Sequence, residues 1–307
     1  MSNDTCAMTA SQIAARISSG KLTAEAVMSD HLARIAARDG AVNAFIDLNA
    51  DRALRLARAA DQQPKKGPLH GVPFAVKDII DTVDLPTSWG SPIYKGFQAP
   101  RNASCVEMLM RAGAIPIGKT VTTEFAYFSP GATRNPHNLD HTPGGSSSGS
   151  AAAVADGMAV FGLGSQTAAS LTRPAAYCGV FGYKASQGSI DLQGVMGLAA
   201  SLDSLGLLAR GIHDLILARA ALCGTVLPGD MQGHSSPQNI AFFKGPHWHE
   251  ASQSSQDACF SAAEALRFAG VSVTDLESPA EFTHLSECHK TVMAFEVARA
   301  RHFEFRN

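Results

Sequence analysis

The chain has 307 residues, of which 45% are hydrophobic and 17% charged, and its formal net charge at pH 7 is −2. This composition is typical of a globular protein and excludes a disordered chain. The near-neutral charge gives no basic field that would favour nucleic acid or an anionic membrane as a partner. Asp156 interrupts the longest apolar run, over 151–164, so no segment reaches the roughly 18 residues of a membrane-spanning helix.

The N-terminus and the cysteines indicate a cytoplasmic protein. Residues 1–4 lack the basic segment and the apolar stretch of a signal peptide. The six cysteines are scattered without a Cys-x-x-Cys pair, so we expect reduced thiols rather than a disulfide framework. Cys178 lies among Tyr177, Val180 and Phe181, and we expect it to be a buried structural thiol.

The first half of the chain predicts alternating helices and strands. Apolar residues recur at helical spacing in the first sixty residues, with a helix start at Thr23 and a second helix over 51–60. A polar loop over 62–68 separates these helices from a buried strand, Val72–Val76, which ends at Lys77. A helix over 105–114 and a strand over 114–118 follow.

The second half of the chain continues this alternation. Residues 134–149 are predicted to be a loop, 150–158 a helix of small residues and 160–164 a short strand. Further helices are expected over 215–223 and 259–269 and from about Val292, and further strands over 239–243 and 271–273. The alternation indicates an α/β fold.

Two serines in small-residue, glycine-bearing segments, Ser146 and Ser170, are candidate nucleophiles. A serine hydroxyl needs a base, and neither segment has a histidine in an obvious partner position. Lys77 is a candidate base, because burial at the end of an apolar strand favours the neutral amine. The backbone N–H groups before Ser170 could hold a developing oxyanion, at about 3–4 kcal/mol per donor.

The ordered blocks of this chain resemble the amidase signature family of serine hydrolases. The similarity extends from about Gly71 to Leu215 and is weaker in the N-terminal helices. So many blocks in one order are far more specific than one motif. The blocks are Gly71–Asp78, Gly118–Thr120, Glu124–Ala126, Gly144–Ser147, Thr167–Ser170, Pro174–Gly182 and Ser201–Ser204.

The resemblance implies a Lys–Ser–Ser catalytic triad. Ser170 would be the nucleophile, Ser146 would relay the proton from a cis peptide bond, and Lys77 would be the general base. Thr167, Ala168, Ala169 and Ser170 would form the oxyanion hole with their backbone N–H groups. An acyl-enzyme would form with release of ammonia or an amine, so the implied enzyme is an amidase for small linear amides, without metal or cofactor.

The resemblance also implies a fold and a domain organisation. The family fold is a large mixed, mostly parallel β-sheet covered by helices on both faces. We expect one domain over 1–307, with N-terminal helices over 1–66, the signature core over 67–225 and the start of a C-terminal segment over 226–307. Because family members usually continue well beyond this length, that segment is expected to be truncated. Apolar surface left uncovered would favour self-association, such as a homodimer.

The segment around the nucleophile departs from the family pattern. The family usually has glycines where this chain has Ala168 and Ala169. If Ala169 needs a positive φ, its Cβ costs on the order of 1 kcal/mol and tilts the oxyanion N–H. A second hypothesis is therefore a catalytically impaired homologue that serves as a binding or assembly subunit.

Three further residue patterns have alternative interpretations. Arg173 resembles the carboxylate anchor of family members that hydrolyse small carboxylated amides, but it could instead bind loop carbonyls. Gly145–Gly149 fits the Gly-x-Ser-x-Gly elbow of an α/β-hydrolase esterase with Ser147 as nucleophile, or a flexible linker. The clusters at His247–Glu250 and at His284 with Cys288–His289 are interpreted as surface histidines rather than metal ligands.

Overall fold

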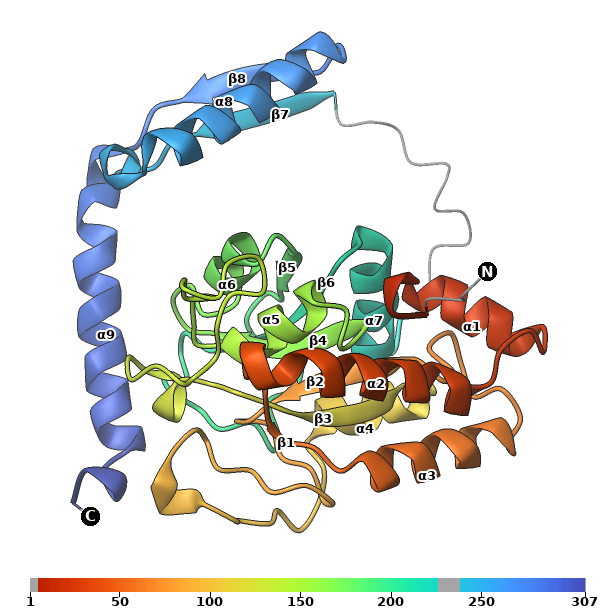
Figure 1. Ribbon diagram of the computed structural model, residues 1–307. Helices are drawn as coiled ribbons and strands as arrows, with labels where there is room; N and C mark the ends of the chain where they lie inside the picture. Colours follow the sequence, from red (N-terminus) through yellow and green to blue (C-terminus); the bar gives the residue numbers. More distant parts are fainter. Residues whose placement is uncertain (1–4, 226–237, 307) are drawn as a thin grey trace. The chain divides into compact units, whose positions relative to one another are not determined.

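The computed structural model describes residues 5–225 and 238–306. These residues belong to two compact units, one comprising Met1–Leu227 and Glu296–Asn307, the other Pro228–Phe295. The first unit holds a six-stranded sheet and the second a two-stranded sheet (Figure 1). The single domain expected over 1–307 stays a prediction. Among the described residues, no helix is long and apolar enough to cross a lipid bilayer.

The six-stranded sheet has the order β1-β3-β2-β4-β6-β5. Strands β3, β2 and β4 are parallel neighbours, whereas β1 pairs antiparallel with β3, and β6 antiparallel with both β4 and β5. Four of these strands therefore run in one direction, which confirms the mixed, mostly parallel sheet. The strands are β1 (Phe45–Asp47), β2 (Pro73–Lys77), β3 (Ile115–Thr120), β4 (Phe161–Gln166), β5 (Phe181–Lys184) and β6 (Ser204–Ala209).

Helices cover both faces of this sheet. Successive side chains of a strand point to opposite faces, and here the side chains on both faces are apolar and need cover. Phe74 and Val76 of β2 share a core with α1, α4 and α7, whereas Ala75 between them packs in a second core with α2, α3 and α5. A smaller core joins α5 to α6. The helices are α1 (Ala10–Ser18), α2 (Ala24–Val42), α3 (Ala50–Asp61), α4 (Ser104–Arg111), α5 (Ser148–Ala155), α6 (Thr172–Tyr177) and α7 (Ile212–Cys223).

Helix α5 is buried at almost every position because its residues are small. A Cβ placed on Gly149 would lie 2.2 Å from Ala44 O and 2.4 Å from Val121 N. Ser150 Oγ donates to Leu163 O at 2.9 Å and lies 2.6 Å from Thr120 Oγ1. The flexible-linker interpretation of this segment is therefore wrong, since its end forms a fixed contact with strands on either side.

Most predicted elements are present within a few residues of their expected bounds. Thr23 caps α2 as expected, because its hydroxyl accepts a hydrogen bond from Ala26 N at 3.1 Å. Strands β1, β5 and β6 and helix α6 were not predicted. They have only three to six residues each, and such short elements carry little periodicity. Helix α9 begins at Leu285, earlier than expected.

The second unit is built on two parallel strands, β7 (Asn239–Phe243) and β8 (Ser272–Leu276), joined through α8 (Gln253–Phe268). Helix α9 (Leu285–Ala300) belongs to this unit up to Phe295 and to the first unit from Glu296. Phe242, Trp248 and Phe260 form an aromatic cluster, with ring centroids 5.6–5.9 Å apart. Short 3-10 helices complete both units: Thr5–Ala7, Pro92–Tyr94, Glu124–Ala126, Trp248–Glu250, Ala280–His284 and Glu304–Arg306.

Candidate active site

Lys77 is the last residue of β2, a strand buried at all five positions. Its Nζ donates hydrogen bonds to Ser146 Oγ at 2.7 Å and to Ser165 Oγ at 2.8 Å. Burial lowers the pKa of Lys77 from its ordinary value to about 7, although the charge of Asp203 opposes this effect. A substantial share of this amine is therefore uncharged at neutral pH and able to accept a proton.

Ser146 lies in the loop that leads into α5, and its side chain is buried. The Gly145–Ser146 peptide bond is cis, as the resemblance implies. Thr123 N donates to Ser146 O at 3.3 Å. Arg173 donates to Gly145 O from both Nε and Nη2, at 3.1 and 2.8 Å. The loop around the cis bond is thus held by one backbone and two guanidinium hydrogen bonds.

Ser170 follows β4 and is buried, with 9% of its surface exposed. Ser147 N donates to Ser170 O at 3.0 Å, which places the two serine segments side by side. Strands β2 and β4 are neighbours, with Val76 opposite Leu163. Parallel pairing therefore brings the ends of both strands, and with them Lys77 and the Ser170 segment, to one edge of the sheet.

The backbone beside Ser170 leaves three consecutive donors available. Within the described part of the chain, the N–H groups of Ala168, Ala169 and Ser170 make no hydrogen bond. The next two, of Leu171 and Thr172, both donate to Gln166 Oε1, at 3.0 and 2.9 Å. Neither alanine has a positive φ. The left-handed conformation considered for Ala169 is therefore not adopted, and its Cβ strains no backbone there.

Asp203 joins the Ser170 loop to a neighbouring segment. Its Oδ1 accepts from Thr167 Oγ1 at 2.5 Å, and its Oδ2 accepts from Leu198 N and Ala199 N at 2.7 and 3.0 Å. Burial raises the pKa of this carboxyl. Neither Asp203 nor Ser165 was singled out from the sequence. Asp203 lies in a block that resembles the family, whereas Ser165 has no sequence signal beyond its place near the end of β4.

The family model for amidases matches residues 26–305 of this chain. The chain belongs to the amidase family. It is 41% identical over 227 residues to a glutamyl-tRNA(Gln) amidotransferase subunit of Thermobifida fusca, and the match covers 71% of this chain and 46% of that protein. It spans about half the length of the curated relatives that it matches first.

Solved structures of amidases have the same fold as this chain. The native peptide amidase from Stenotrophomonas maltophilia superposes with a TM-score of 0.85 at 31% identity, covering 96% of this chain and 66% of that one. A glutamyl-tRNA(Gln) amidotransferase subunit from Thermotoga maritima gives a TM-score of 0.81 at 25% identity, covering 97% and 67%. The resemblance inferred from the ordered sequence blocks is thereby confirmed.

This amidase chain has a second buried lysine, Lys119, on the neighbouring strand β3. Its Nζ donates to Ile80 O and Thr87 Oγ1, both at 2.6 Å, and lies 3.5 Å from Asp78 Oδ1. Burial lowers the pKa of Lys119 to about 8, and the nearby carboxylates, Asp78 first, oppose this. The two lysines differ in that Lys119 has a carboxylate partner, whereas Lys77 contacts hydroxyl groups.

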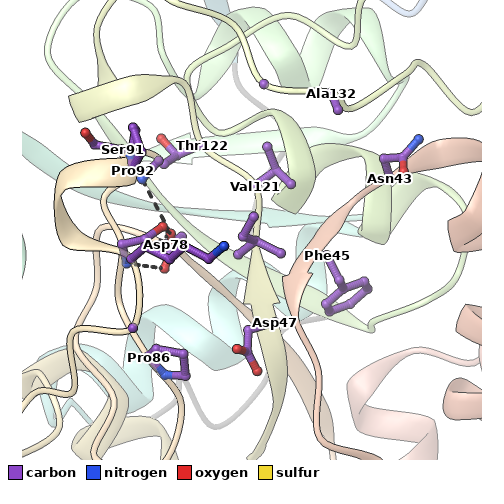
Figure 2. A pocket seen from close by; sticks show the side chains of 16 residues that line it. Asn43, Phe45, Asp47, Asp78, Pro86, Ser91, Pro92, Val121, Thr122 and Ala132 are labelled. Carbon is purple, nitrogen blue, oxygen red and sulfur yellow. Dashed lines mark hydrogen bonds between the residues drawn. The ribbon is translucent and has the colours of Figure 1, made fainter.

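A cavity of about 600 Å³ lies between β1 and the loops that follow β2 and β3. Figure 2 shows Asp78, Asp47 and Phe45 around it, with hydrogen bonds from the 88–90 backbone to the Asp78 carboxylate. The lining includes none of Lys77, Ser146 and Ser170.

Two other interpretations find less support in this amidase fold. Ser147 is buried, its hydroxyl donates to Ser165 O at 3.3 Å, and the residues before it are loop rather than strand, so an esterase elbow is not formed. His247 contacts Glu250 and Ser286, and no group of metal-binding side chains is found among the described residues.

Cys178 is buried, and burial raises the pKa of its thiol to about 12. Both observations agree with the structural thiol expected from the sequence.

Proposed function

We propose that this chain hydrolyses small linear amides through Lys77, Ser146 and Ser170, with an acyl-enzyme intermediate. The observation that carries the proposal is the 2.7 Å contact between Lys77 Nζ and Ser146 Oγ at the end of a buried strand. A neutral amine there has a hydroxyl partner to deprotonate, and that hydroxyl lies in the segment beside Ser170. This arrangement supplies the base that a serine nucleophile needs.

The proposed reaction has two half-reactions. Lys77 accepts the Ser146 proton, Ser146 accepts the Ser170 proton, and Ser170 Oγ attacks the amide carbon. The N–H groups of Ala168, Ala169 and Ser170, with Thr167 at the start of the loop, stabilise the oxyanion. The relayed proton passes back to the leaving nitrogen, and ammonia or an amine departs. Water then attacks the ester by the same relay and regenerates Ser170, so no metal or organic cofactor takes part.

A fluorophosphonate probe tests the assignment of the nucleophile. We expect mass spectrometry of the labelled, digested chain to place the adduct on Ser170, because this residue lies on the loop of the oxyanion donors and its carbonyl is bonded to the segment of Ser146. Ser170→Ala should remove the label, whereas Ser147→Ala should retain it. Labelling that persists in Ser170→Ala, or that is lost in Ser147→Ala, contradicts the assignment.

A second proposed function is that of a subunit in a complex. The relatives are named as subunits of an amidotransferase, and one similar solved structure, with a TM-score of 0.86, is described as a vestigial protein complex. In this proposal the chain contributes binding or assembly and has no turnover by itself. Hydrolysis of a simple amide by the purified chain alone contradicts it. A cytoplasmic location and a homodimer also remain proposals.

Arg173 gives a prediction that separates its two interpretations. Its guanidinium donates two hydrogen bonds to the loop, and Gly145 O accepts both of them. We therefore expect Arg173→Met to lower kcat/KM by a similar factor, about tenfold, for butyramide and for succinamate. Steady-state kinetics with the two substrates makes the comparison. A loss confined to succinamate would instead assign Arg173 as the carboxylate anchor.

A further inference from the structure

A second cavity, of about 290 Å³, lies within the first unit. Apolar and aromatic side chains dominate its lining, together with one arginine, two glutamates and one serine. We call it the aromatic pocket. The lining residues used below are Ile93, Glu124, Phe125, Phe128, Leu198, Arg301 and Glu304.

Two walls of the aromatic pocket are bonded to the candidate active site. On one side, Phe125 lies two residues after Thr123 in the sequence, and Thr123 N donates to Ser146 O at 3.3 Å. On the other side, Leu198 N donates to Asp203, which also accepts from Thr167 of the Ser170 loop. Short bonded stretches of the chain therefore connect two lining residues, Phe125 and Leu198, to the two serine segments, although neither serine lines the pocket itself.

Phe125, which lines the aromatic pocket, and its neighbour Trp89, which does not, both have an unusual backbone conformation. Trp89 and Phe125 have φ values of 56° and 50°, and Phe125 N donates to Trp89 O at 2.8 Å. Bulky residues rarely adopt positive φ, and such conformations persist where the surrounding structure imposes them. Tyr94 packs against Trp89 with ring centroids 4.1 Å apart. These contacts hold Phe125 in place before any ligand binds.

Arg301 and Glu304, two of the three charged residues that line the pocket, neutralise each other. The Arg301 guanidinium lies over the rings of Trp89 and Phe125, at 5.7 and 5.8 Å from their centroids. It donates to Glu304 Oε1 at 2.9 Å and to Gly197 O at 2.7 Å. Tyr94 OH donates to the same Glu304 oxygen at 3.0 Å. With its charge paired to Glu304, Arg301 is a poor anchor for a carboxylate. The second lining glutamate, Glu124, disfavours a carboxylate further, so the pocket suits an uncharged group better than an anionic one.

We propose that the aromatic pocket binds a phenyl-sized neutral group of the substrate, so that the preferred amides carry an aromatic ring a short linker away from the carbonyl. This inference rests on the proposed amide hydrolysis. Protein cavities of about 150 Å³ bind benzene, so 290 Å³ holds a ring together with its linker. Phe128 is 72% exposed at this pocket and gains cover when a ring binds.

Binding to the Ser170→Ala chain tests the proposal without turnover. We expect 3-phenylpropionamide to bind at least tenfold more tightly than propionamide, measured by NMR titration. Ile93→Trp, which fills the pocket from a side chain that is 46% exposed, should remove this difference, and Phe128→Ala should reduce it severalfold. Ile212→Trp, at a similarly exposed residue outside the pocket, is the matched control and should keep the full difference. Equal affinities, or a preference that survives Ile93→Trp, overturn the proposal.

The kinetics of the unsubstituted chain separate this proposal from the proposed function. Hydrolysis of both amides with equal kcat/KM contradicts the aromatic pocket and leaves the hydrolase assignment standing. Preferential binding of the phenyl amide without hydrolysis of either compound supports the pocket and contradicts the hydrolase assignment. A kcat/KM at least tenfold higher for 3-phenylpropionamide supports both.

Discussion

Replacing Lys77 with methionine should lower kcat/KM for a simple amide by about 10²- to 10⁴-fold, the range that a general base contributes. Methionine fills a similar volume in the buried strand but cannot accept a proton. Ser146 then loses the amine bonded to its hydroxyl, and the other group bonded to Lys77 Nζ, the Ser165 hydroxyl, is not a base. Steady-state kinetics of the purified variant measures the loss, and circular dichroism checks that the fold is retained.

Lys77→Arg is the matched control for charge. Arginine keeps a cation at this position but is protonated at every accessible pH, so it cannot act as a base. We therefore expect Lys77→Arg to be as inactive as Lys77→Met. Activity within tenfold of the unsubstituted chain in either variant would contradict the role of Lys77.

The same assignment fixes the direction of the pH dependence. Burial gives Lys77 a pKa of about 7, and only the neutral amine accepts a proton. For the unsubstituted chain, kcat/KM should therefore rise with pH through about 7 and level off above it. A rate that falls with rising pH over this interval would exclude a neutral lysine as the base.

Gly149→Ala should destabilise the first unit by at least about 3 kcal/mol, the upper part of the range for overpacked cores. The added Cβ would lie 2.2 Å from Ala44 O and 2.4 Å from Val121 N. Both are backbone atoms, so no side-chain rotation relieves the clash. Thermal unfolding should show a midpoint lower by at least about 6 °C.

Gly40→Ala is the control for the glycine-to-alanine change itself. Gly40 lies within helix α2, and a Cβ there meets no atom within 4 Å. Alanine has the higher helix propensity, so this variant should be more stable by up to about 1 kcal/mol. If both variants unfold at the same temperature, the close contact of α5 with its neighbours does not limit stability.

The sequence predicted those parts of the site that depend on long or repeated patterns. The apolar run before Lys77 identified a buried strand, and the small residues after Ser146 identified a helix. Ser165 could not be predicted, because a serine near a strand end acquires its role only when β2 and β4 pair. Arg301 could not be placed either, since its contacts join it to residues some two hundred positions earlier.

The short elements escaped prediction for a different reason. Strand β6 is buried on all six positions, but its Ser204–Ala209 segment contains a glycine and has no alternation of polar and apolar residues. Helix α6 has six residues and a proline at Pro174. Packing against α5 and β5 stabilises both β6 and α6. Such tertiary contacts leave no periodic pattern of apolar residues in the sequence.

The burial of Lys77 couples the folding of this chain to proton release. At neutral pH the unfolded chain carries this amine protonated, whereas the folded chain holds it with a pKa of about 7. Between that value and the ordinary lysine pKa, the unfolded state binds more protons, so the contribution of Lys77 to stability becomes more favourable as pH rises. The side chain that supplies basicity to the active site therefore opposes folding most strongly at and below neutral pH.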